Sequence, residues 1–425
     1  MADAASGGDP AARRWLIVGV LFANLGMLYG AWYAYSVLLV ALLKEFAWPR
    51  SVVAGGFSAF VLVHGSLSPV IGLLAARYGP RRLILIGSCV IGVGLLLAAH
   101  ISAWWHLYLF FGGICAMGIS LSGWLPSVLI TRGWFPTRMG TAVGIVSAGI
   151  GIGISGVVPL TQYLIDRVGW RWTLRTLALL ITGWVLPATL WLVRDPPPVE
   201  VQTGARRSPS SSGGTHSYWT LATAVRDRRF WALAGVFFSG NVTTQMLLVH
   251  QVAYLVDHGV SPLAAASVSG VVGLASIVGK TAWGALSDRK GREIAYTLSF
   301  GCVVASVGAL VLAGWHPDTV MPYVYGALIG LGYAGTAPLT PAAASDLFGG
   351  PGYSIIFGSL HFMLCVGAAT GSWGAGKIFD ATGSYRWALW AALVAALVAP
   401  ALMWVAAPRR PHPPPLAECP MTNSQ

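Results

Sequence analysis

Apolar stretches of about 20 residues recur along the whole chain and are separated by short polar breaks. A helix of this length spans the ~30 Å hydrocarbon layer of a bilayer, and in lipid every backbone amide has to bond within its own segment. Only 9% of the residues are charged, against roughly 25% in soluble domains. We therefore expect an all-α integral membrane protein with twelve transmembrane helices, at residues 15–43, 52–76, 83–102, 105–131, 139–165, 172–193, 230–256, 262–286, 293–314, 320–345, 354–379 and 385–407.

The longest polar segment divides the predicted helices into two groups of six. It runs from Arg194 to Arg229 and contains a tract rich in Pro, Ser and Gly that cannot pack a core. We expect an N-terminal six-helix half at residues 1–193, a cytoplasmic linker at 194–229, a C-terminal six-helix half at 230–407 and a disordered, proline-rich cytoplasmic tail at 408–425.

The basic residues are distributed unevenly over the predicted loops. Eighteen of the 26 Lys and Arg residues lie on the side that carries both termini, and seven lie on the other side. Because cytoplasmic loops retain Lys and Arg, we expect a multi-pass protein of the cytoplasmic membrane with both termini in the cytoplasm. Topology, with some attraction to anionic lipid headgroups, then accounts for the net charge of +12, which requires no nucleic-acid partner.

A charged, glycine-containing motif occurs at equivalent places in the two predicted halves. "GALSDRKGRE", from Gly284 to Glu293, and "GLLAARYGPRR", from Gly72 to Arg82, each join the second and third spans of a half. Aligning them matches Arg77 with Arg289 and places Ala76 opposite Asp288. Any cytoplasmic helix end can carry such arginines, but two copies in register indicate an internal repeat, which is typical of alternating-access transporters built from two related halves.

The form GxLxDRxGR in this loop resembles the signature of the major facilitator superfamily. The resemblance implies the major facilitator fold, and it implies that the motif is a gate that holds the cytoplasmic side shut in the outward-facing state. The corresponding gate residues here are Asp288, Arg289 and Arg292 in the second half and Arg77 and Arg81 in the first. Since the first half has lost its acid at Ala76, we expect its latch to be the weaker one.

A second stretch, "TRGWFPTRMGTAVGIVSAGIGIG" from Thr131 to Gly153, is similar to the fourth-to-fifth helix signature of monocarboxylate and oxalate/formate transporters. An aromatic-Phe pair is followed by a basic residue, Arg138, which joins the predicted gate, and then by spaced Ala and Gly. Gly149 and Gly153 form a small-xxx-small face that allows close helix contact in lipid. This resemblance implies a carboxylate substrate.

Lys280 is the one formal charge well inside a predicted span. It precedes Asp288, at the predicted cytoplasmic helix end, by eight residues, so it lies about 12 Å deeper and close to the membrane midplane. A charge there costs at least ~2.5 kcal/mol unless it faces a partner or a wet cavity. The family has an arginine at the corresponding point that pairs with the substrate carboxylate, which implies the same role for Lys280. The alternative is a lysine paired structurally with an acid or with helix carbonyls.

Other polar residues inside the spans are candidates for cavity lining or proton transfer. Asn241 and Gln245 lie one turn apart on one helix face and, with Tyr29, Tyr33 and Tyr333, are expected to line the substrate cavity. His64, His250 and His361 are proton-relay candidates because imidazole titrates near neutral pH. Each of these histidines has the alternative role of a hydrogen-bonded packing residue.

These observations predict a secondary active transporter that moves a mono- or dicarboxylate by proton symport or anion exchange. Alternatives are an exporter of a drug-like or amphipathic metabolite, and a receptor of the same fold that does not transport. The chain shows no Walker motif, no metal-ligand spacing and no nucleophile elbow, so we expect no cofactor, no metal and no enzymatic activity. Its partners would be the substrate, protons or a counter-anion, and membrane lipid, with the monomer as the expected functional unit.

Overall fold

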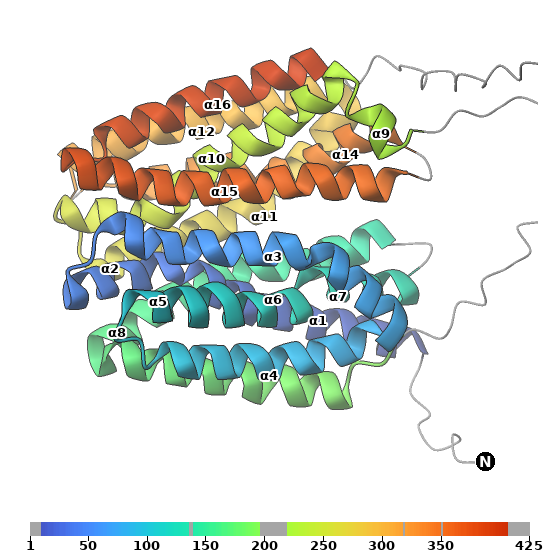
Figure 1. Cartoon of the computed structure of the whole chain (residues 1–425), viewed down its shortest axis with the longest axis horizontal. Coiled ribbons are helices and arrows are strands. Elements are labelled where there is room, and N and C mark those ends of the chain that lie inside the picture. Colours follow the sequence, from blue (N-terminus) through green and yellow to red (C-terminus); the bar gives the residue numbers. More distant parts are fainter. Residues whose placement is uncertain (1–9, 136–138, 196–218, 318, 350–351, 407–425) are drawn as a thin grey trace, which may run out of the picture.

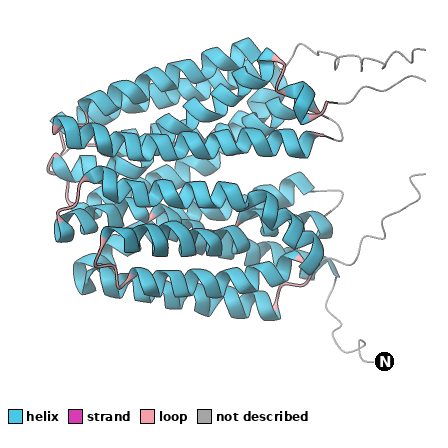
Figure 2. Cartoon of the chain, in the orientation of Figure 1, coloured by secondary structure: helices cyan, strands magenta, loops and turns pink. Residues whose placement is uncertain are grey.

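The described residues form a bundle of helices without any strand in that part of the chain (Figures 1 and 2). The computed structural model describes residues 10–135, 139–195, 219–317, 319–349 and 352–406. The prediction of an all-α membrane protein is thereby confirmed. Two layers are visible in Figure 1, one from the N-terminal half and one from the C-terminal half.

The N-terminal layer is built from long helices and from one crossing that is divided into short segments. Its elements are α1 (Pro10–Tyr33), α2 (Tyr35–Phe46), α3 (Arg50–Tyr78), α4 (Pro80–Ala98), α5 (Trp104–His106), the π-helical segment η1 (Leu107–Cys115), α6 (Ala116–Ser122), α7 (Trp124–Trp134) and α8 (Met139–Trp191). The segments α5 to α7 together occupy the span predicted at 105–131. π-Helical turns inside helices are frequent at functional sites.

The C-terminal layer repeats this arrangement. Its elements are α9 (Leu221–Ala224), α10 (Arg228–Asp257), α11 (Pro262–Lys290), α12 (Arg292–Trp315), α13 (Met321–Ala334), α14 (Thr336–Phe348), α15 (Tyr353–Thr382) and α16 (Arg386–Ala406). The break between α13 and α14 falls at Gly335.

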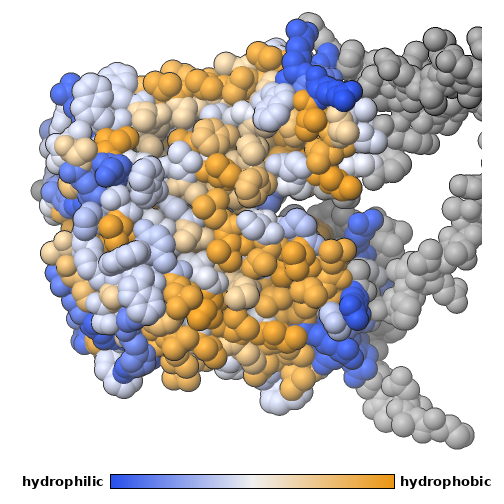
Figure 3. Space-filling view, viewed as in Figure 1, coloured by the Kyte–Doolittle hydropathy of each residue, from blue (hydrophilic) through white to orange (hydrophobic). Residues whose placement is uncertain are grey.

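Ten helices in the described residues are long and apolar enough to cross a membrane. The helix α8 counts once among them, although Gly169, with φ 77°, turns the chain between two helical parts. The shorter helices α13 and α14 are not among the ten. If α8 is counted as two crossings and α13 with α14 as one more, the total is the twelve predicted spans. Figure 3 shows an apolar face bounded at both ends by hydrophilic residues, and large side chains on the outside, such as Leu179 at 70% exposure, suit contact with lipid.

Residues 196–218, which make up most of the predicted linker, lie outside the described residues. Residues 407–425, which include the whole predicted tail, also lie outside them. The described end of the linker folds against the C-terminal half, because Trp219 is buried and its ring meets Phe348 at a centroid distance of 5.2 Å. Among the cysteines, Cys115 and Cys365 are buried, Cys302 is half-buried and Cys89 is exposed, all as free thiols. Cys419 lies outside the described residues.

We call the end of the bundle where α1 begins and α16 ends the proximal end, and the opposite end the distal end (Figure 1). The two halves meet where α3 lies beside α15 and α8 beside α11. The hydrogen bonds that join them include Ser58 Oγ to the carbonyl of Ala369 and Ser155 Oγ to the carbonyl of Gly270, both at 2.8 Å. These contacts lie toward the distal end, whereas Figure 3 shows the surface hollowed between the halves near the proximal end.

Glycines bring the helix backbones together within each half. Gly149 and Gly153 of α8 lie against the backbone of α1, and a Cβ at Gly153 would come within 2.7 Å of Gly26 Cα. Gly367 and Gly371 of α15 lie against α10 in the same manner. The predicted close contact at Gly149 and Gly153 is thus present, and it is repeated in the second half. Small residues permit this approach in lipid, where no hydrophobic effect joins helices.

Candidate substrate site and gates

Lys280 lies on α11, about 15 Å from the proximal end of that helix and about 27 Å from its distal end, at ~1.5 Å per residue. It shares a helix face with Gly273 and Ile277, and both of these contact Gly151 of α8 in the other half. Lys280 therefore follows the contact between the halves by one turn, on the side of the proximal hollow. Within the described residues its amine has no hydrogen bond or ion pair.

The three candidate tyrosines come together from both halves. Tyr33 lies within electrostatic range of Tyr29, also on α1, and of Tyr333 on α13. Tyr333 in turn lies beside Ser276, one turn before Lys280. Phenol groups from the two halves thus come together, and that of Tyr333 lies beside the turn of α11 that precedes Lys280. This grouping agrees with a role in lining a shared cavity.

Asn241 and Gln245 are both buried on α10. The amide of Asn241 donates to the carbonyl of Phe237 at 3.0 Å, a bond within its own helix. Gln245 Oε1 is buried and accepts no hydrogen bond from the described residues. A buried acceptor without a partner is costly, so Gln245 is the better candidate of the two for a ligand contact.

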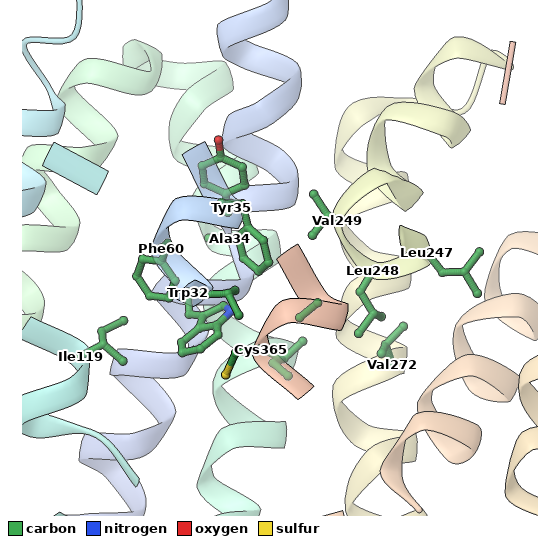
Figure 4. Close-up of a cluster of buried hydrophobic side chains, with 14 of the residues drawn as sticks. Trp32, Ala34, Tyr35, Phe60, Ile119, Leu247, Leu248, Val249, Val272 and Cys365 are labelled. Carbon is green, nitrogen blue, oxygen red and sulfur yellow. The ribbon is translucent and has the colours of Figure 1, made fainter. Parts of the chain in front are cut away.

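An aromatic cluster that the sequence did not single out stands next to these residues. The indole of Trp32 on α1 packs on Phe60 at 4.5 Å, on His64 at 4.9 Å and on Tyr29 at 5.3 Å between ring centroids. Its Nε1 is buried without a hydrogen-bond acceptor among the described residues. Figure 4 shows Trp32 with Phe60 on one side and Cys365 of the other half beneath it. Trp32 is an unassigned donor near the meeting point of the halves.

The three histidines fall into two places. His64 on α3 and His361 on α15 lie within electrostatic range of each other across the two halves, and His64 Nδ1 lies 2.9 Å from Ser120 Oγ. His250 lies apart from them, toward the distal end. Its two ring nitrogens meet the hydroxyl of Tyr385 at 2.9 Å and the carbonyl of Ser372 at 2.8 Å.

The predicted gate motif of the second half forms an ion-pair network at the proximal end. The guanidinium of Arg292 binds Asp288 at 2.6 Å and Asp346 at 3.0 Å, and it also donates to Ser287. Asp346, at the end of α14, was not connected with this motif in the sequence analysis. Arg289 is exposed beside this network.

In the first half, which lacks the motif's acid at Ala76, another acid, Asp195, contacts the motif. Asp195, after α8, accepts from the backbone amide of Arg81 at 3.1 Å. The side chain of Arg81 donates to the carbonyls of Thr189 at 3.4 Å and Leu190 at 2.5 Å, at the end of α8. Asp195 therefore caps the start of α4 while Arg81 binds the end of α8, where the helix dipole is negative.

Among the described residues, the gate candidate Arg77 takes no part in these bonds. Arg77 is exposed, with its guanidinium 5.2 Å from the ring centroid of Tyr78. Arg138 lies outside the described residues.

A cluster at the distal end joins both halves and was also missed. Arg50, at the start of α3, binds Asp257 of α10 at 2.7 Å and the hydroxyl of Tyr385 at 2.7 Å. Its guanidinium lies 3.8 Å from the ring centroid of Phe379. Asp380 of α15 accepts from the backbone amides of Arg50 and Ser51, both at 2.8 Å. The chain has only 14 acids, and this scarcity was the one available signal that an acid at a helix end matters.

The family model of the Major Facilitator Superfamily matches the chain over residues 21–349 and 255–419. Monocarboxylate transporter 2 of Homo sapiens is 24% identical over 388 residues, which cover 88% of this chain and 81% of that protein. Monocarboxylate transporter 13 of Bos taurus is 27% identical, with 87% and 84% covered. An uncharacterized MFS-type transporter, YhjX of Escherichia coli K12, is 26% identical, with 79% and 81% covered.

Among solved structures, the chain is similar to a bacterial homolog of the human lysosomal transporter Spinster in an inward-facing and unoccupied conformation. The TM-score is 0.69 with 16% sequence identity, and the match covers 94% of this chain and 98% of that one. At this identity the likeness shows the fold alone. The fold and the relatives are those of membrane transporters, not of enzymes.

Proposed function

Since this chain belongs to the Major Facilitator Superfamily, we propose that it is a secondary transporter of small mono- or dicarboxylates, which bind between the two halves next to Lys280. The superfamily is one of multi-pass transporters, and several relatives are named monocarboxylate transporters. The substrate class and the coupling are our inference from the site.

Lys280 is the observation that carries the proposal. Lys280 lies well inside the span α11, on the helix face that also carries the contact with α8 of the other half, and among the described residues no acid pairs with its amine. An intramembrane cation is costly without a counter-charge, and a carboxylate substrate would supply that charge. Tyr29, Tyr33 and Tyr333 would donate hydrogen bonds to the same substrate. Its apolar part would contact the aromatic cluster around Trp32.

The arrangement of the halves supports alternating access. They are joined by Arg50 and Ser58 at the distal side, and the surface is hollowed at the proximal side. If the proximal end is cytoplasmic, as the excess of basic residues there predicts, this is an inward-facing arrangement. The Arg292 and Arg81 networks would then be the gate elements that engage the opposite half when the proximal side closes.

Uptake into proteoliposomes tests the proposal. The purified protein would be assayed with a panel of radiolabelled short mono- and dicarboxylates, and Lys280→Gln would be compared with Lys280→Arg. Gln keeps much of the length and the hydrogen bonding but removes the charge. We expect it to lower kcat/KM by at least ~30-fold, which corresponds to the ~2 kcal/mol lost with one partner of a buried charge pair.

The expected result for Lys280→Arg is partial activity, because the charge persists with a different geometry. Lys44→Gln is the matched control, since Lys44 is exposed at the distal end, and it should transport normally. Wild-type rate and affinity in Lys280→Gln would refute the anion site. Transport of amphipathic cations or neutral compounds without carboxylates would favour the exporter, and saturable binding without any flux would favour the receptor.

A further inference from the structure

The hydrogen bonds around His250 fix its protonation state while the distal side is closed. A backbone carbonyl only accepts, so the nitrogen that faces the carbonyl of Ser372, Nε2, has to carry a proton. The guanidinium of Arg50 only donates, so the hydroxyl oxygen of Tyr385 accepts from it. That hydroxyl then points its own proton at Nδ1 of His250. Hydrogen bonds are therefore donated from Arg50 to Tyr385, from Tyr385 to His250, and from His250 to the carbonyl of Ser372. In this chain of bonds the imidazole of His250 is neutral.

The same chain of bonds holds the two halves together. Arg50 belongs to α3, whereas Tyr385, Asp257 and Asp380 belong to the C-terminal half. Ser372 also binds across the halves, because its hydroxyl lies 2.7 Å from that of Ser58. His250 is only 3% exposed, so its ring is almost completely enclosed in this arrangement. The imidazole is therefore enclosed by the contacts that close the distal side.

A second proton on His250 is incompatible with this network. If Nδ1 were protonated, its N–H would point at the Tyr385 hydroxyl, whose own proton already points at Nδ1. It would also put a cation one hydroxyl away from the guanidinium of Arg50. The other titratable groups around the ring are Asp257 and Tyr254 on α10, Asp380 and the exposed Lys377 on α15, and Tyr385 before α16. Both acids are already engaged by Arg50 or by the start of α3.

We propose that His250 is a proton-binding site that is accessible only when the distal side is open, so that proton binding and distal closure exclude each other. In the open state, a hydronium ion from the distal solution transfers its proton to Nδ1 and leaves as water. In this state the Tyr385 hydroxyl is already separated from Arg50, and it turns its own proton away from Nδ1. By linkage, any state that binds the proton more tightly is favoured as pH falls. Low pH therefore opens the distal side, and high pH closes it.

The proposed transport function gives this proton site its purpose, but the site itself can be tested without any substrate. Ser58 is 8% exposed and sits between the halves on the distal side of the Gly65 contact with Cys365. The rate at which Ser58→Cys reacts with a maleimide therefore reports distal opening. The reaction is run on the full chain in detergent and read by mass spectrometry of that peptide. It is normalised at each pH to Thr382→Cys, an exposed position, which removes the effect of pH on thiol reactivity.

We expect the normalised rate to rise between about pH 7.5 and about pH 5.5 by roughly 5- to 100-fold, because one linked proton changes the ratio by at most ~10-fold per pH unit. His250→Gln should abolish this rise and leave labelling slow at both pH values. A glutamine amide donates and accepts as neutral histidine does but does not titrate. His316→Gln, at an exposed position at the distal end of α12, should retain the full response.

Three results would overturn the inference. They are a pH-independent rate with His250 present, an undiminished pH response in His250→Gln, and fast labelling of His250→Gln at both pH values, which would show a purely structural role. None of these bears on Lys280. Loss of carboxylate uptake in Lys280→Gln together with a flat labelling profile would keep the transport proposal and reject the proton site. Normal carboxylate uptake in Lys280→Gln, together with a pH-dependent labelling rate that His250→Gln abolishes, would keep the proton site and reject the anion site.

Discussion

Three glycines on one helix, α8, distinguish a contact that opens from a contact that stays closed. Gly151 faces α11 of the other half, and a Cβ there would lie 2.7 Å from the carbonyl oxygen of Gly273 and 2.5 Å from Ile277 Cγ1. Gly153 faces α1 of its own half, whereas a Cβ at Gly156 would meet no neighbouring atom within 4 Å. We expect Gly151→Ala to shift the protein toward the distal-open state without loosening its fold.

The size of the effect follows from the space that the methyl group needs. Ordinary contact begins at 3.4 Å and the carbonyl of Gly273 lies at 2.7 Å, so the two backbones have to part by the difference, 0.7 Å. Overpacking of this kind costs about 1–3 kcal/mol. If the distal-open state relieves all of it, the ratio of open to closed protein rises by about 5- to 150-fold. In Gly153→Ala the methyl group would lie 1.9 Å from the carbonyl oxygen of Gly26, and this larger cost falls on the fold, since both helices belong to one half.

The measurement combines the labelling rate of Ser58→Cys with thermal unfolding in detergent. Gly151→Ala should label faster and unfold near the wild-type temperature. Gly153→Ala should label at the wild-type rate and unfold at a lower temperature. Gly156→Ala should change neither, apart from a slight gain in helix propensity.

A Gly151→Ala protein that unfolds early and labels no faster would refute the reasoning. The contact between α8 and α11 would then be a permanent part of the fold, and the halves would not separate along it. Faster labelling in both Gly151→Ala and Gly153→Ala would show instead that the assay reports general loosening.

Three further predictions concern the gates and the coupling. Asp346→Asn should change the labelling rate of Ser58→Cys in the same direction as Asp288→Asn, because both acids bind Arg292; opposite signs would show that the two do not act together. Asp195→Ala should lower the free energy of unfolding by ~0.5–2 kcal/mol through loss of the helix cap on α4, as measured by thermal or denaturant unfolding, whereas Asp195→Asn should retain most of it. An inward proton gradient should accelerate carboxylate uptake and a protonophore should abolish the increase; uptake that ignores pH and requires internal substrate would establish anion exchange.

The predicted candidates that depend on depth or repetition could be located from the sequence, whereas those that depend on partners could not. Lys280 was located by its distance from Asp288 along a helix, because helical rise converts residue number into depth. The charge cluster was recognised because it occurs twice. Arg50 gave no such signal, since its partners Asp257, Asp380 and Tyr385 are more than 200 residues away. The contact of Asp195 with Arg81 was hidden for the same reason, because only the position of Ala76 was compared with that of Asp288 in the sequence analysis.

That the chain is helical and lies in a membrane follows from the amino-acid sequence, because the length and apolarity of each segment leave no other way to satisfy the backbone in lipid. The two-fold repetition follows from it as well, through the matched loops and the polar segment between the halves. Which side of the bundle is closed, and which histidine lies among the closing contacts, can be seen only in the packed helices. Those properties depend on contacts between helices from different halves. Such contacts are set by the packing of small residues and by a few polar groups whose spacing along the chain carries no information about their spacing in the membrane.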